Sequence, residues 1–91
     1  MPSVNFTTHL PRFFPTLKQG TSAEGQTVAE VIRSLEQKHP GLAAYIVDER
    51  GSLRKHVNIF VNDELIIDRV ALSDAVGHKT RVFIFQALSG G

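Results

Sequence analysis

One segment of this sequence carries a complete set of helix signals. Four apolar residues recur there at helical spacing and form a single stripe: Val28, Val31, Ile32 and Leu35. Thr27 can cap the first turn, and Glu30, three residues later, can reach back to the Thr27 amide, as in a capping box. His39-Pro40-Gly41 ends the helix. This amphipathic helix must bury its stripe against another layer of the fold.

Short segments with strand character surround the helix. They are residues 4–8, a weak segment at 17–22, residues 57–61, 65–67 and 81–86. Asn62-Asp63-Glu64 supplies turn chemistry between the third and fourth segments, which predicts a hairpin. Residues 42–47 suggest one more helical turn before a polar loop at 48–55. The pattern predicts an α+β fold with a mixed sheet of about four to five strands over one main helix.

Length and composition limit the classes of function. The 91 residues fit one compact domain with a modest core. A formal net charge of +1 argues against nucleic acid as the main partner. The absence of cysteine excludes a thiol nucleophile within this chain. No apolar run is long enough to span a membrane and no secretory signal is recognisable, so we expect no membrane partner and a cytoplasmic location.

The last five residues have no helix or strand signal. We therefore expect residues 1–86 to form the domain and residues 87–91 to form a flexible tail that ends in Gly90-Gly91. Glycines without Cβ atoms would let this tail enter a narrow channel. The Gly91 carboxylate is a poor electrophile until it is activated, typically by ATP as an acyl adenylate, and sulfide would then convert it to a nucleophilic thiocarboxylate. A frayed terminus without function is the alternative.

Taken together, the motifs resemble those of the MoaD/ThiS family of ubiquitin-like sulfur carriers. The resemblance rests on five segments in order: Thr27-Val28, Leu35-Glu36, His39-Pro40-Gly41-Leu42, residues 57–64 and Gly90-Gly91. It implies a β-grasp fold, with Gly91 as the site of adenylation and thiocarboxylation and Gly90 as the other tail glycine. It also implies an adenylating partner related to ubiquitin-activating enzymes, which uses ATP, and a synthase that accepts the sulfur.

Within this family, the chain looks closest to the carriers that feed cysteine synthesis, on residues 57–64 with Leu53 and His56 before them. The turn Gly77-His78-Lys79-Thr80 departs from the acidic turn that is common in these relatives. The small subunit of molybdopterin synthase is the alternative within the family. Two alternatives of other classes are a protein modifier, joined through Gly91 to lysines of its targets, and a plain β-grasp interaction module.

The last predicted strand is apolar on both faces. If Val82 and Ile84 point toward the helix together with Val57, Ile59 and Val61, then three phenylalanines lie on the opposite face: Phe60, Phe83 and Phe85. An exposed apolar patch of this kind often marks a protein interface. We predict that these phenylalanines bind partners together with Leu88 of the tail. The alternative is that the loop at residues 11–15 covers them.

The remaining polar motifs suggest no catalysis by this chain alone. The four histidines, His9, His39, His56 and His78, show no metal-binding spacing, and we expect neither a metal site nor a bound cofactor. No nucleophile elbow, phosphate loop or dinucleotide fingerprint occurs, so we expect a protein co-substrate and not an enzyme. A basic cluster at Arg50, Arg54, Lys55 and His56 is either a solvated loop or a surface that attracts an acidic partner.

Overall fold

The computed structural model describes residues 2–6 and 20–86. Its elements, in chain order, are β1 (Ser3–Phe6), β2 (Thr21–Ser22), α2 (Val28–Lys38), α3 (Ala43–Ile46), β3 (Val57–Val61), β4 (Glu64–Leu65) and β5 (Arg81–Gln86). This order of strands and helices confirms the one predicted from the sequence. The parts of the first two predicted strands at residues 7–8 and 17–19 lie outside the described residues.

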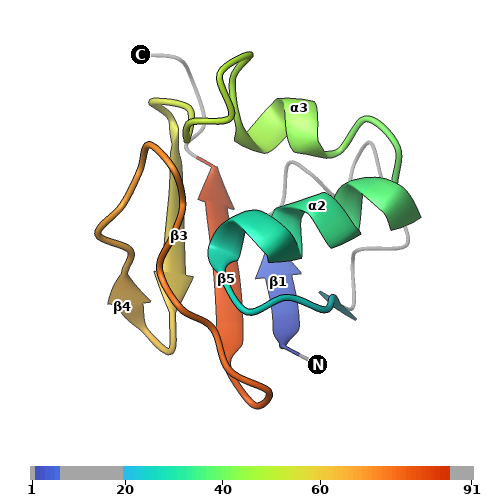
Figure 1. The fold of residues 1–91 in the computed structure, drawn as a ribbon, viewed down its shortest axis with the longest axis vertical. Coiled ribbons are helices and arrows are strands. Elements are labelled where there is room, and N and C mark those ends of the chain that lie inside the picture. The colour runs from blue at the N-terminus through green and yellow to red at the C-terminus, as the bar shows by residue number, and fades with distance from the viewer. Residues whose placement is uncertain (1, 7–19, 87–91) are drawn as a thin grey trace.

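The five strands form one mixed sheet in the order β2-β1-β5-β3-β4. β5 lies between β1, which runs parallel to it, and β3, which runs antiparallel. Helix α2 crosses one face of this sheet, and the chain then turns back so that the short helix α3 lies beside α2 (Figure 1). The first and last strands are therefore parallel neighbours, and the chain leaves the sheet from its middle strand.

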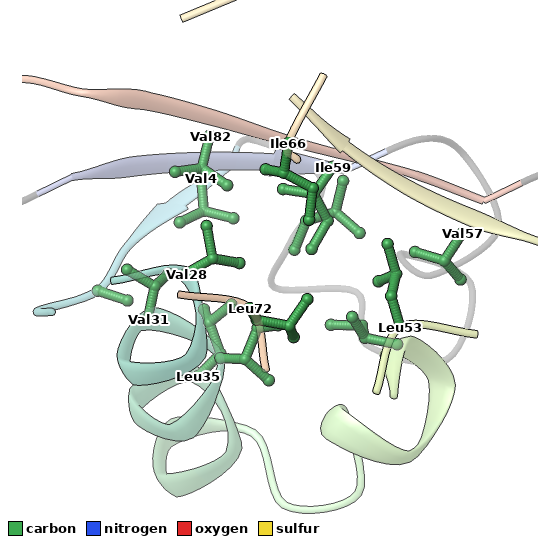
Figure 2. Close-up of a cluster of buried hydrophobic side chains, with 14 of the residues drawn as sticks. Val4, Val28, Val31, Leu35, Leu53, Val57, Ile59, Ile66, Leu72 and Val82 are labelled. Atoms are coloured by element: carbon green, nitrogen blue, oxygen red, sulfur yellow. The ribbon is translucent and has the colours of Figure 1, made fainter. Parts of the chain in front are cut away.

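The core fills the space between the sheet and the two helices. All four residues of the α2 stripe are buried, and they face buried side chains from β1, β3 and β5. Figure 2 shows Val28 of the helix pointing toward Val4 and Val82 of the sheet, while Leu35 lies beside Leu72. Ile46 of α3 is also fully buried. The helix thus packs on one face of the sheet only, which leaves the other face for different contacts.

The start of α2 differs from the expected capping box in one contact. The Thr27 hydroxyl accepts a hydrogen bond from the Glu30 amide at 3.2 Å, as predicted. The Glu30 carboxylate, however, accepts from the amide of Gln26 at 3.0 Å and not from that of Thr27. Thr27 has an extended backbone and forms an antiparallel bridge with Ala75. The Glu30 carboxylate therefore meets the amide of Gln26, one residue before Thr27.

The segments on either side of β3 and β4 are less simple than predicted. The loop at 48–55 is not wholly polar, because Leu53 is buried in the core and bridges to Val47. The predicted strand at 65–67 ends at Leu65, because the amide of Ile67 donates to the Asp74 carboxylate at 3.0 Å and so leaves the ladder. Asn62 and Asp63 both have positive φ (50° and 70°), which makes the tight hairpin turn that the sequence predicts.

Candidate functional site

Strand β5 is the last element before the predicted C-terminal tail. Its last residue, Gln86, pairs with Val57, the first residue of β3. The chain therefore leaves the sheet beside the loop that precedes β3. Leu88, Gly90 and Gly91 lie outside the described residues, and their predicted roles stay predictions.

The sheet face opposite α2 carries the predicted aromatic residues. Side chains on β5 alternate, with Val82 and Ile84 buried while Phe83 and Phe85 are 39% and 41% exposed. Phe60 of β3 is the direct cross-strand partner of Phe83 and is half-buried. The structure therefore brings the three phenylalanines together on one open face, here called the phenylalanine face (Phe60, Phe83 and Phe85). The loop at 11–15, the alternative cover for this face, lies outside the described residues.

Leu65 belongs to the same row of side chains, which the sequence reasoning did not recognise. It pairs with Phe60 across the β3–β4 hairpin, and it is 51% exposed. On the far side of the row, Asn5 pairs with Phe83. A two-residue turn at Asn62-Asp63 fixes the register of the hairpin, so this pairing could have been derived from the sequence. The apolar row thus runs from β5 to the β4 edge of the sheet.

Arg69 connects the end of the phenylalanine face to the start of β3. One terminal nitrogen of its guanidinium donates to the Asn58 side-chain oxygen at 3.0 Å, and Asn58 is the cross-strand partner of Phe85. The other nitrogen donates to the carbonyl oxygens of Arg54 and Val57, at 2.9 and 3.0 Å. Because Arg69 comes from the loop after β4, eleven or more positions from these acceptors, no local sequence signal could have assigned it this role.

Two carboxylates hold the loop that carries Arg69. Asp68 accepts hydrogen bonds from the Ser73 hydroxyl and from three backbone amides of residues 70–73. The Ser73 hydroxyl and these amides hold the pKa of Asp68 well below its usual range. Asp74 accepts from the amides of Ile67 and Asp68, at 3.0 and 2.8 Å. The loop thus has a defined conformation without helix or strand.

A similar carboxylate organises the turn after α2. Glu36 accepts from the amides of Gly41 and Ala43, both at 2.9 Å. These hydrogen bonds lower the pKa of Glu36, and the bond from Gly41 has the largest effect. Gly41 has a φ of 96°, which explains why glycine follows Pro40 at this turn. The segment Leu35 to Leu42 carries part of the family resemblance. Its hydrogen bonds therefore fix the connection between α2 and α3.

The described residues contain no group of three or more His, Cys, Asp or Glu side chains that could hold a metal ion. Among the helices in these residues, none is long and apolar enough to cross a membrane.

Comparison with known proteins identifies the family. The model of the ThiS family matches residues 12–91. The chain belongs to the ThiS family. Sulfur carrier protein CysO of Mycobacterium tuberculosis is 34% identical over 76 residues, which cover 81% of this chain and 82% of CysO. The crystal structure of that CysO superposes with a TM-score of 0.85 at 30% identity, covering 97% of this chain and 100% of CysO.

Two further relatives are similar over most of this chain. A crystal structure of the BexX/CysO complex of Amycolatopsis orientalis contains a chain with a TM-score of 0.83 and 28% identity, over 100% of both chains. Small archaeal modifier protein 3 of Haloferax volcanii is 27% identical over 88 residues, covering 88% of this chain and 95% of the modifier. The protein is thus a ThiS-family sulfur carrier with a ubiquitin-like β-grasp fold, related to CysO, and it is a non-catalytic carrier.

Proposed function

We propose that this carrier donates sulfur from a thiocarboxylate on Gly91 to cysteine synthesis. The observation that carries the proposal is the similarity to CysO over most of both chains, together with a family match that extends through Gly91. Under this proposal, residues 1–86 are the β-grasp domain and residues 87–91 are the tail. The cytoplasm, where ATP and sulfide are available, is the proposed place of action.

The proposed chemistry has two steps in the adenylating enzyme. A Gly91 carboxylate oxygen attacks the α-phosphate of ATP, which forms an acyl adenylate and releases pyrophosphate. Sulfide, delivered directly or from a protein-bound persulfide with a reductant, then adds to the acyl carbon and displaces AMP. One carboxylate oxygen is thereby replaced by sulfur, and Gly90 leaves room for the enzyme to close around the reacting group.

The phenylalanine face is the proposed docking surface for the enzymes that take the tail. Phe83 and Phe85 precede the tail on β5 and are exposed, whereas the helix side of the same strand is buried. Aromatic side chains at the centre of an interface often supply a large part of its binding energy. We propose that Phe60 and Leu88 complete this surface. The proposed partners are an adenylating enzyme related to ubiquitin-activating enzymes and a synthase that forms cysteine.

The destination of the sulfur tests the proposal. The carrier would be loaded with isotopically labelled sulfide, purified, and mixed with a cysteine-forming synthase and its amino-acid acceptor. We expect the label to appear in free cysteine and the carrier to return to its unloaded mass. Label that stays on the carrier with this synthase, but moves to a molybdopterin precursor with the large subunit of molybdopterin synthase, would contradict the cysteine branch.

A protein modifier is the second candidate, because of the similarity to small archaeal modifier protein 3. In that case Gly91 would form isopeptide bonds with lysines of other proteins after the same adenylation. An affinity-tagged chain expressed in its native host distinguishes the two. Covalent adducts that survive denaturation and disappear when Gly91 is deleted would favour the modifier, and their absence would favour the carrier alone.

A further inference from the structure

The length of the tail limits where a partner enzyme must touch this protein, if Gly91 reacts as proposed. Five residues follow Gln86, and fully extended they reach at most about 17 Å. The enzyme that takes Gly91 must therefore bring its surface within that distance of the end of β5. Gln86 pairs with Val57, so the loop immediately before Val57 borders any such contact.

Three basic residues lie at this border, and within residues 2–6 and 20–86 none of them forms an ion pair. Lys55 and His56 are exposed in the turn that leads into β3. Arg69, half-buried beside them, donates only to uncharged oxygens, those of the Asn58 amide and of the Arg54 and Val57 carbonyls. Lys55, His56 and Arg69 are here called the tail-exit rim. Because Asn58 is the cross-strand partner of Phe85, the rim continues the phenylalanine face.

The neighbouring carboxylates of Asp68 and Asp48 form no ion pair with the tail-exit rim within the described residues. The Asp68 carboxylate accepts from amides of its own loop, and the Asp48 carboxylate accepts from the amides of Arg50 and Ser52. Within residues 2–6 and 20–86 the recorded ion pair, Arg81 with Asp63 at 3.2 Å, lies at the opposite end of β5.

The basic cluster predicted from the sequence is divided by the fold. Arg50 and Arg54 line a surface hollow together with Asp48 and Glu49, so acidic side chains accompany them there. The Arg54 side chain is also directed toward α3, where its Nε donates to the Ala44 carbonyl at 2.8 Å. The fold therefore leaves Lys55 and His56 at the tail exit and places Arg50 and Arg54 at the hollow and against α3.

We propose that the tail-exit rim binds carboxylates on the enzyme that takes the tail, beside the entrance of its channel. This inference rests on the proposed function. Exposed charges at the edge of an interface contribute little affinity but steer the approach and raise the association rate. The rim would orient the carrier so that the tail meets the channel, while the phenylalanine face supplies apolar contact.

A pair of charge reversals tests the rim. Lys55→Glu changes the rim, whereas Lys79→Glu makes the same change of net charge in the exposed turn before β5. The first and last of the six residues of β5 lie about 17 Å apart. The association rate of each variant with an adenylating enzyme that binds the wild-type chain would be measured by stopped-flow without ATP. Both lysines are exposed, so the two variants should unfold at the wild-type urea concentration.

We expect Lys55→Glu to slow association about fivefold at low salt and Lys79→Glu to change it less than twofold. The difference should vanish near 1 M salt, where the Debye length is about 3 Å. Equal slowing by both variants would mean that only net charge matters, and slowing that persists at 1 M salt would mean a packing defect; either overturns the proposal. Binding without ATP is independent of sulfur loading. A chain that binds the enzyme through the rim but never gains sulfur would therefore refute the proposed function, while the proposal that the rim binds carboxylates would stand.

Discussion

Two neighbouring residues of β5 provide the sharpest test of how the sheet divides its two faces. Ile84 is fully buried against the helix layer, whereas Phe83 is 39% exposed on the phenylalanine face. Truncating each to alanine removes an apolar side chain from the same central strand. The backbone and strand pairing are shared, so the difference between the variants reports the environment of each side chain.

The expected costs differ because only one truncation creates a cavity. An Ile to Ala change in a core costs about 2–5 kcal/mol, which is a large part of the roughly 5–14 kcal/mol expected for a domain of this size. A fully buried Phe side chain contributes about 1.5–3 kcal/mol. Since Phe83 retains 39% exposure, its truncation should cost about 1–2 kcal/mol, including the cross-strand contact with Phe60.

Urea unfolding measures these costs, and the loading reaction measures the role of the face. Taking the middle of each range, Ile84→Ala should lower the free energy of unfolding by about 2 kcal/mol more than Phe83→Ala. Phe83→Ala should lower kcat/KM for loading by tenfold or more under conditions where both chains are folded. Equal destabilisation by the two truncations would refute the division of faces. Loading of Phe83→Ala at the wild-type rate would refute the proposed docking surface.

Three further outcomes follow from local contacts. Thr27→Ala removes the hydroxyl that caps α2 and should cost about 1 kcal/mol in urea unfolding, whereas Thr27→Ser should cost less than half of that. Asp68 and Glu36 have lowered pKa values in the folded chain. The stability that these carboxylates provide is therefore present above about pH 4, where carboxylates of the unfolded chain ionise. It is lost as the pH falls through the lowered pKa values. Asp68→Asn should therefore flatten the fall of the unfolding midpoint between pH 5 and pH 2, and an unchanged slope would contradict this role. Gly91→Ala should leave the unfolding midpoint unchanged and strongly slow loading, and full loading of this variant would contradict the narrow channel.

Local sequence signals predicted the elements whose causes are local. The cap at Thr27, the apolar stripe of α2 and the turn at Asn62-Asp63 each lie within a few residues, and each is present in the structure. Alternation along β5 separated Phe83 from Ile84 because successive side chains of a strand point to opposite faces.

Contacts between distant segments could not be predicted in this way. Arg69 reaches the start of β3 from the loop after β4, and Asp68 and Asp74 fold that loop through backbone amides. Polar residues in an irregular segment look like any solvated loop until the partners of their side chains are known. For the same reason, the sequence could not predict which basic residues of the 50–56 segment line the surface hollow and which belong to the tail-exit rim.

Whether Gly91 carries the sulfur can be measured from the intact mass of the protein. The full chain and a chain lacking Gly91 would each be incubated with ATP, sulfide and the adenylating enzyme, and then weighed by mass spectrometry. We expect a mass gain equal to the exchange of one oxygen for sulfur, in the full chain only. No gain with an enzyme that is active on another carrier, or the same gain without Gly91, would contradict it.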